Sequence, residues 1–208
     1  MILSLFMAAC VAAEAPGGSS DSLVSLYQRG RTFPEFLSAA TSRKDTWERN
    51  AGRRSFEPTL MNRARALDRT WRILVVAEDW CGDSANTIPY LGTFADSAGG
   101  KLEIRIVNSV DGRWVMERYR TGDGRAATPT VVILDEQGEA AGCWVERPSE
   151  LAGWMREQRG KLSQDELLKQ KYAWYDDDQG QSTLREILDL IEHPRSEGCG
   201  GNAAEGKP

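Results

Sequence analysis

The most informative stretch of this chain reads Ile73-Leu74-Val75-Val76-Ala77-Glu78-Asp79-Trp80-Cys81-Gly82-Asp83-Ser84. Its first five residues form a continuous apolar run, which predicts a strand that is covered on both faces. We expect a helix to begin at about Gly82 and to continue to about Ser97, with a kink at Pro89 because proline removes one helical hydrogen bond. The stretch therefore predicts a cysteine at a turn from a buried strand into a helix.

The position of Cys81 suits thiol chemistry. Unpaired N–H groups at the start of a helix favour a negative charge, and the thiolate is the form that attacks disulfides. Asp79 and Asp83 oppose this effect by charge repulsion, so we expect a moderately activated thiol. Ser84 has a hydroxyl that can donate to the sulfur or cap the helix, but it cannot form a disulfide.

The rest of the chain predicts alternating helices and strands. Thr32-Phe33-Pro34-Glu35 is a capping box that predicts the start of a helix, and Thr183-Leu184-Arg185-Glu186 predicts another. The other expected helices cover residues 58–67, 111–119, 148–159 and 163–175. Further strands are expected at 102–107, 130–134 and 140–145, the last two forming a hairpin around 135–138. A strand-helix-strand unit pairs in parallel and a hairpin pairs antiparallel, so the sheet should be mixed.

The segment from Ile73 to Pro148 resembles the thioredoxin fold, with Trp80-Cys81-Gly82-Asp83-Ser84 in the place of the family's Trp-Cys-Gly-Pro-Cys. Pro89 matches the proline that kinks the active-site helix of the family. Thr128-Pro129-Thr130 resembles its cis-proline loop. The resemblance implies an α/β thioredoxin-like fold, with a mixed central sheet flanked by helices and helical extensions at both ends of the chain.

The resemblance also implies site residues. Cys81 is the expected nucleophile, and Ser84 is expected to tune its thiolate. The expected substrate-binding residues are Trp80, Gly82, Asp83, Thr128 and Pro129. No metal or organic cofactor is implied.

A second resemblance covers most of residues 25–192. The segments that carry it are Tyr27, Phe33, Glu78-Asp79-Trp80-Cys81-Gly82-Asp83, Glu146-Arg147-Pro148 and Trp174-Tyr175 to Glu192, and together they are similar to a bacterial group of single-cysteine thioredoxin family proteins. Ser84 replaces the resolving cysteine of dithiol thioredoxins, and Val75 stands where they bury an aspartate.

These two departures imply monothiol thiol–disulfide exchange through Cys81, with a role in cell redox homeostasis. The expected partners are a disulfide-bearing protein and a low-molecular-weight thiol that resolves the mixed disulfide. The alternative is a redox-inactive interaction module that keeps the binding groove of the fold without thiol chemistry.

Two other cysteines are alternative candidates for a resolving partner. Cys143 lies on the second hairpin strand, where the turn would place it roughly opposite Thr130, and Cys199 lies on a glycine-rich tail. The simpler interpretation is that Cys143 is a small apolar residue within a strand.

The chain is expected to divide into five segments. These are a flexible leader (1–22), a helical extension (23–70), a thioredoxin-like core (71–160), a C-terminal helical extension (161–193) and a disordered tail (194–208). The leader contains Met7-Ala8-Ala9-Cys10, which looks like a weak lipoprotein cleavage box. We expect a cytoplasmic protein, and the alternative is lipid anchoring or export to the cell envelope through Cys10.

Composition excludes several classes of function. The formal net charge of −5 and the pI of about 5.1 argue against nucleic-acid binding, which requires clustered basic residues. No apolar run is long enough to predict a membrane span. The spacing of the four cysteines matches no zinc motif. The single histidine, His193, is expected to lie at the end of a helix.

Overall fold

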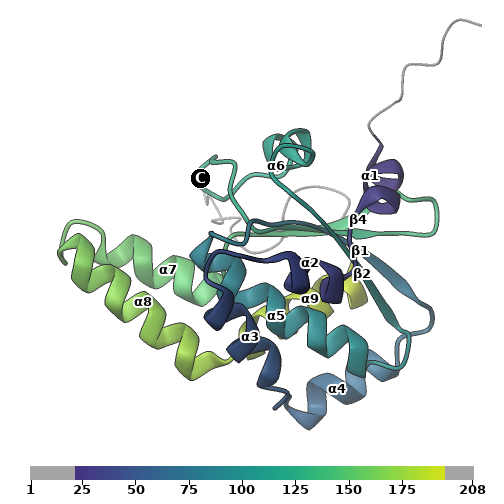
Figure 1. Ribbon diagram of the computed structural model, residues 1–208, viewed down its shortest axis with the longest axis horizontal. Coiled ribbons are helices and arrows are strands. Elements are labelled where there is room, and N and C mark those ends of the chain that lie inside the picture. Colours follow the sequence, from purple (N-terminus) through teal and green to yellow (C-terminus); the bar gives the residue numbers. More distant parts are fainter. Residues whose placement is uncertain (1–21, 195–208) are drawn as a thin grey trace, which may run out of the picture.

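The computed structural model describes residues 22–194, which form a four-stranded sheet with helices on both faces (Figure 1). The strands are β1 (Trp71–Val76), β2 (Leu102–Val107), β3 (Thr130–Leu134) and β4 (Ala140–Val145). Their order is β2-β1-β3-β4, with β1 parallel to β2 and antiparallel to β3, and with β3 antiparallel to β4. The predicted mixed sheet is confirmed.

The sheet separates two apolar cores. Successive side chains of a strand point to opposite faces, so β1 sends Ile73 and Val75 to one core and Leu74 and Val76 to the other. The larger core also includes residues from α2 (Phe33–Ala39), α3 (Lys44–Gly52), α4 (Pro58–Arg65), α5 (Gly82–Ser97) and α9 (Gln181–Glu192). The smaller core includes residues from α1 (Leu23–Arg29) and α6 (Arg113–Arg118). The apolar run in β1 is therefore buried on both faces, as predicted.

The first capping box is present at the start of α2. The Thr32 side chain accepts a hydrogen bond from the Glu35 N–H, and the Glu35 carboxylate accepts one from the Thr32 N–H at 2.8 Å. This reciprocal arrangement satisfies two backbone donors that a helix start leaves unpaired. The N-terminal half of the larger core thus begins where the sequence predicts.

The second capping box is absent, and that prediction was wrong. Helix α9 begins at Gln181, after Gly180 with φ of 80°, and Thr183 is buried within the helix. Glu186 does not reach back to the helix start. It accepts hydrogen bonds from Trp144 Nε1 (2.6 Å) and from the Ser149 N–H (2.8 Å). The Glu186 carboxylate, which the local pattern predicts as part of a capping box, therefore makes tertiary hydrogen bonds instead. His193 does cap the end of α9.

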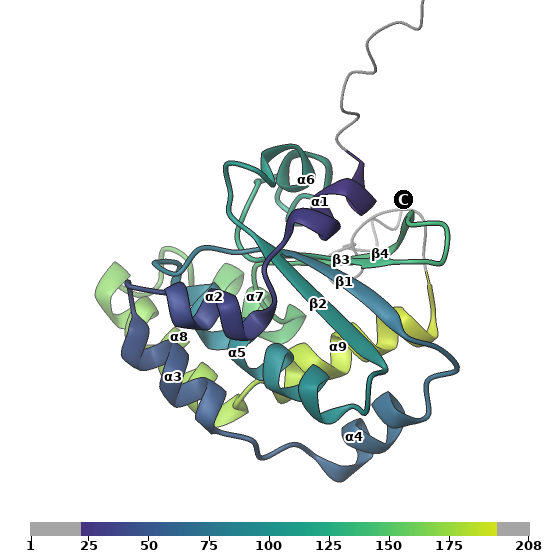
Figure 2. The ribbon, with the colours of Figure 1, turned by 45° about the vertical axis from the view of Figure 1, so that its right-hand side comes forward.

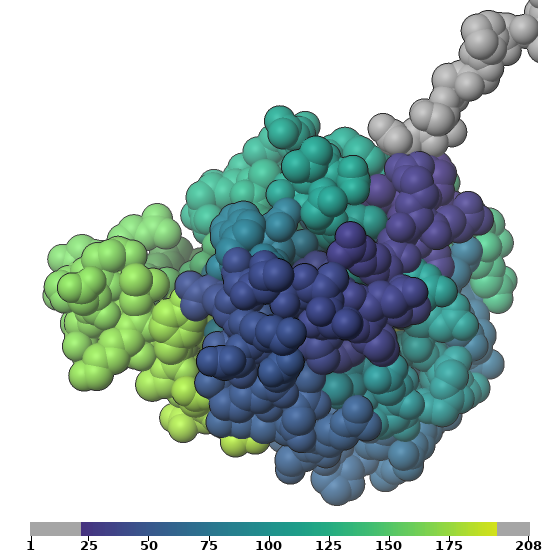
Figure 3. All heavy atoms as spheres, in the orientation of Figure 1, coloured from purple at the N-terminus to yellow at the C-terminus, as the bar shows by residue number. Residues whose placement is uncertain are grey.

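Helices α7 (Ser149–Gln158) and α8 (Gln164–Asp178) form an arm on one side of the molecule, clearest in the space-filling view (Figure 3). Helix α9 then returns beneath the sheet (Figure 2). The arm contacts the N-terminal helices, because Asp176 of α8 pairs with Arg53 at 3.3 Å and with Arg49 at 4.0 Å. The C-terminal arm therefore contacts α3 and the residue that follows it.

Candidate thiol site

Cys81 is the N-terminal cap of α5. Its carbonyl accepts the Ala85 N–H at 3.0 Å, and its Sγ accepts the Ser84 N–H at 3.5 Å. The sulfur thus takes the role that a serine or aspartate oxygen has at most helix starts. The residue is 9% exposed, and it is the free cysteine that the described residues contain.

The cis-proline loop lies against the thiol. The Cys81 Sγ is 3.2 Å from the Thr128 carbonyl oxygen, and the Thr128–Pro129 peptide bond is cis. The loop is fixed from behind, since the Pro129 carbonyl accepts the Glu146 N–H at 2.7 Å. Thr128 and Pro129 are thus brought to Cys81 from 47 residues along the chain.

Ser84 lies inside α5 and is buried. Its N–H contacts the sulfur, but its hydroxyl oxygen has no hydrogen-bond partner among residues 22–194. The sequence suggests that this hydroxyl either caps the helix or donates to the sulfur. Cys81 is the cap instead, and the hydroxyl makes neither contact. The backbone of Ser84, and not its hydroxyl, makes the contact with the thiol.

Trp80 is the exposed side chain next to the thiol. Its side chain is 59% exposed, whereas Trp47 and Trp144 of the larger core are buried. Its carbonyl accepts a hydrogen bond from Arg43 Nε at 2.7 Å, which holds the backbone and leaves the indole open to solvent. This arrangement suits a side chain that contacts a bound partner.

The Asp79 carboxylate is held by hydrogen bonds from the segment between α2 and α3. Its carboxylate accepts the backbone N–H groups of Thr41 (2.8 Å) and Ser42 (2.9 Å), and its carbonyl accepts Trp47 Nε1 (2.9 Å). Burial alone would raise the pKa of Asp79, but the N–H groups of Ser42 and Thr41 outweigh burial, and its pKa lies below its ordinary value. The charge of Asp79 is directed at the segment between α2 and α3.

Asp83 is buried among partners from the C-terminal half of the chain. It is 8% exposed, and its carboxylate accepts from Tyr175 (2.7 Å), Lys171 (3.1 Å) and Arg147 (3.2 Å). Two cations and a hydroxyl therefore compensate its charge. These groups, which no local sequence pattern places here, offset the repulsion that Asp83 would exert on the thiolate. Burial, followed by the charge of Asp83, raises the pKa of Tyr175 well above its ordinary value.

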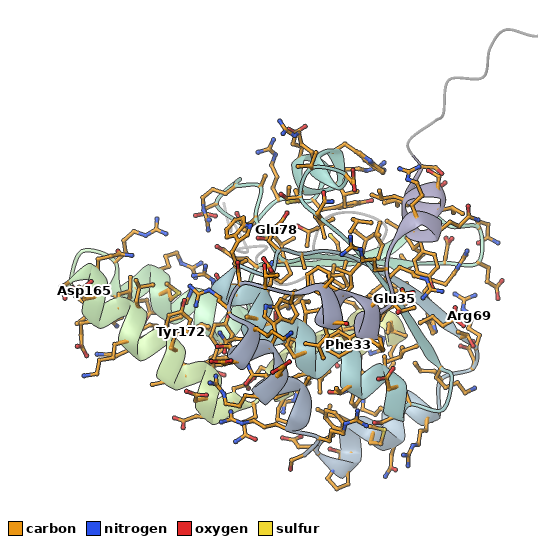
Figure 4. The ribbon with its side chains drawn as sticks, viewed as in Figure 1. Phe33, Glu35, Arg69, Glu78, Asp165 and Tyr172 are labelled. Atoms are coloured by element: carbon orange, nitrogen blue, oxygen red, sulfur yellow. The ribbon has the colours of Figure 1, made fainter. Side chains whose placement is uncertain are left out.

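Gly82 is covered by Tyr172 of α8, which lies on the side of the arm that faces the body of the molecule (Figure 4). A Cβ atom at residue 82 would overlap the Tyr172 hydroxyl. The Tyr172 ring also lies near two cations, with the Lys171 ammonium 5.0 Å and the Arg43 guanidinium 6.0 Å from its centroid. The turn after Cys81 is thus packed against the arm.

Sequence patterns did not predict five residues that surround the thiol turn: Arg43, Arg147, Lys171, Tyr172 and Tyr175. The hydrogen bonds to Asp83 span 64, 88 and 92 residues along the chain. No local spacing signals such contacts. Two segments, Glu146-Arg147-Pro148 and Trp174-Tyr175, contribute to the resemblance to single-cysteine proteins, but that resemblance assigns their side chains no role.

Cys143 lies away from the thiol. It pairs with Val132 in the hairpin, two positions beyond the predicted Thr130, which pairs with Val145. Its side chain is buried in the smaller core, whereas α5 packs on the opposite face of the sheet. Cys143 is disulfide-bonded. Cys10 and Cys199 lie outside the described residues.

A hollow of about 380 Å³ adjoins the motif on the β2 side. Glu78 and Asp79 line it together with Arg29 and Arg31, so its walls carry both signs of charge. Glu78 is held in place by the Ser109 N–H at 2.7 Å. No cluster of three or more metal-ligating side chains occurs within residues 22–194.

A mixed sheet with a cysteine at the start of its central helix, facing a cis-proline loop, defines the class of thioredoxin-like proteins. The family model described as Thioredoxin matches residues 30–162, more than half of the chain. The chain belongs to this family. No curated protein sequence matches it.

Two solved structures share the fold. A protein of unknown function from Pseudomonas aeruginosa is 21% identical with a TM-score of 0.65, over 82% of this chain and 97% of its own. An HIV epitope scaffold is 20% identical with a TM-score of 0.65, over 84% of this chain and 99% of its own. Among the described residues, no helix is long and apolar enough to cross a membrane.

Proposed function

We propose that this protein carries out monothiol thiol–disulfide exchange through Cys81, as a member of the bacterial single-cysteine group, and that it serves redox homeostasis. The observation that carries the proposal is the position of the sulfur. It caps α5 and lies 3.2 Å from the Thr128 carbonyl of the cis-proline loop, while Ser84 occupies the place of a second thiol.

The exchange takes place in two balanced steps. The Cys81 thiolate attacks one sulfur of a disulfide R–S–S–R, the S–S bond breaks, a mixed disulfide of Cys81 with R forms, and R–S⁻ leaves. A low-molecular-weight thiolate R′–S⁻ then attacks the sulfur of R in the mixed disulfide. R–S–S–R′ forms and the Cys81 thiolate is released. One disulfide replaces another, so the cycle needs an external thiol and no other oxidant or reductant.

The neighbouring residues divide the other tasks. The exposed Trp80 indole and the Thr128–Pro129 loop frame the substrate, and Gly82 allows Tyr172 to approach the turn. Asp83 anchors the turn to the arm through Lys171 and Tyr175. Ser84 prevents an internal disulfide, which leaves the mixed disulfide open to attack by an external thiol.

Turnover of bis(2-hydroxyethyl) disulfide with glutathione as the external thiol tests the proposal. Cys81→Ser is expected to abolish turnover, and Ser84→Ala is expected to retain it because Ala also leaves no internal thiol. Ser84→Cys supplies the missing thiol and is expected to trap Cys81 in an internal disulfide. Turnover that survives Cys81→Ser would refute the mechanism.

The second candidate function is a redox-inactive interaction module. The specific observation that favours it is the contrast between the buried Cys81 thiol, 9% exposed, and the exposed Trp80. A module of this kind keeps its bound partners in Cys81→Ser and loses them in Trp80→Ala. An exchange enzyme loses its covalently trapped partners in Cys81→Ser.

A further inference from the structure

A second cavity, of about 90 Å³, shares no lining residue with the hollow beside β2. It is formed by the loop that precedes Thr128, by the connection from β4 to α7, and by α7 itself. Its charged lining residues are Arg125, Arg147, Arg156, Arg159, Asp123 and Glu146. We call it the arginine cavity. Its volume exceeds that needed by a single water molecule several times over, and a carboxylate group fits within it.

Both carboxylates of the arginine cavity are paired with arginine side chains of the protein. Glu146 accepts from Arg125 at 2.9 and 3.2 Å and also pairs with Arg147. Asp123 accepts from Arg125 Nε at 2.9 Å, and this bond, with one from Thr121, lowers the pKa of Asp123 to about 2. Both acids are therefore paired, and Asp123 is ionised at neutral pH. Four guanidinium groups face two carboxylates, which leaves an excess of positive charge.

The excess positive charge of the cavity lies on α7 and on the residue that follows this helix. Within residues 22–194, the exposed Arg156 has no ion-pair partner, and Arg159 is 73% exposed and 4.0 Å from Asp123. Independently, the buried Nε of Arg147 has no hydrogen-bond partner among the described residues. A buried donor without a partner is costly, and Arg147 lines the cavity, so a ligand that brought an acceptor to this side chain would be favoured.

The arginine cavity is also close to the thiol chemistry. The Glu146 N–H is bonded to the carbonyl of cis-Pro129, and Arg147 is bonded to Asp83 of the Cys81 turn. A group held in the cavity therefore lies beside the loop that faces the sulfur. We propose that the arginine cavity binds a carboxylate of the disulfide substrate, so that the protein selects disulfides with an acidic group near the sulfur.

The chemistry of arginine supports a carboxylate as the ligand. The planar guanidinium forms paired hydrogen bonds with the two oxygens of a carboxylate, as Arg125 already does with Glu146. This inference rests on the exchange reaction proposed above and adds the substrate class. The covalent step is unchanged, because the bound carboxylate only orients the disulfide towards Cys81.

Three disulfides of similar length and different charge test the inference. They are 3,3′-dithiodipropionate (anionic), bis(2-hydroxyethyl) disulfide (neutral) and cystamine (cationic), and the rate of mixed-disulfide formation on Cys81 is followed by mass spectrometry. The wild type is expected to react fastest with the anionic compound. The double variant Arg156→Gln/Arg159→Gln should lower the anionic-to-neutral rate ratio by about two- to fivefold, the range expected when exposed charge pairs are lost.

Arg54→Gln is the matched control, because it removes one exposed arginine between α3 and α4 and leaves the lining unchanged. Its rate ratio should equal that of the wild type. Equal ratios in the wild type and in the double variant would overturn the carboxylate site while leaving the exchange reaction intact. No reaction with any of the three compounds would overturn the exchange reaction itself. A comparison of peptide disulfides that carry glutamate or glutamine beside the half-cystine then shows whether the preference for an acidic disulfide extends to polypeptide substrates.

Discussion

Gly82 illustrates how a single residue links the thiol turn to a distant helix. Its missing side chain leaves room for the Tyr172 hydroxyl, and the next residue, Asp83, is held by Lys171 and Tyr175 of the same helix. The cysteine turn is therefore fixed by its neighbours and not only by its own hydrogen bonds.

Gly82→Ala should destabilise the protein. The added methyl group overlaps Tyr172, and overpacking of this kind costs about 1–3 kcal/mol. Urea unfolding measures the loss. Gly52→Ala is the control, because an added Cβ at the end of α3 meets no atom within 4 Å and alanine favours the helix. If both variants are as stable as the wild type, Tyr172 does not cover the turn.

Asp79 should give the stability a dependence on pH. Its pKa is lower in the folded protein than its ordinary value of 3.8, so its contribution is complete above that value and is lost as pH falls through the folded pKa. The difference in unfolding free energy between the wild type and Asp79→Asn is therefore expected to shrink below about pH 4. Urea titrations at several acidic pH values measure it. A difference that stays constant with pH would contradict the bonds from Thr41 and Ser42.

At the scale of elements, local patterns succeeded where local contacts decide the structure. The apolar run 73–77 predicted a strand buried on both faces, and Thr32 with Glu35 predicted the start of α2, because both depend on residues a few positions apart. The Thr183 box failed because Glu186 bonds to Trp144 and Ser149 across the fold. Propensity gives way when a tertiary partner competes for the same group.

Helix α8 should loosen when its bond to Asp83 is removed. Tyr175→Phe deletes a buried hydroxyl that donates to a carboxylate, which costs about 1.5–3 kcal/mol. Hydrogen exchange in α8 and alkylation of Cys81 should both become faster. Tyr172→Phe serves as the control on the same helix, since its hydroxyl donates no hydrogen bond within residues 22–194. The same response in both variants would show that α8 is held by apolar contacts alone.

At the scale of the whole molecule, the extensions at both ends complete the domain. Helices α3 and α4 and helix α9 share the larger core with β1 and α5. From the sequence, the core and the extensions were expected as separate segments. Their association could not be predicted, because it depends on contacts between residues more than 100 positions apart, such as Arg53 with Asp176.

The shared core predicts a single cooperative unfolding transition. Leu188 of α9 is 0% exposed, and Leu188→Ala should cost about 2–5 kcal/mol, as other buried leucines do. The whole transition should move to lower urea concentration when followed by circular dichroism and by Cys81 labelling. Val110→Ala, at a residue 71% exposed, is the control and should leave the midpoint in place. Two separate transitions in Leu188→Ala would show that α9 is not part of the core.

The intact mass of the folded chain after exposure to glutathione disulfide tests exchange through Cys81. One glutathione adduct is expected on Cys81, with no adduct at this position in Cys81→Ser and complete removal of the adduct by reduced glutathione. Absence of an adduct on Cys81 in the folded wild type, with adduct formation only after unfolding, would contradict exchange through this thiol.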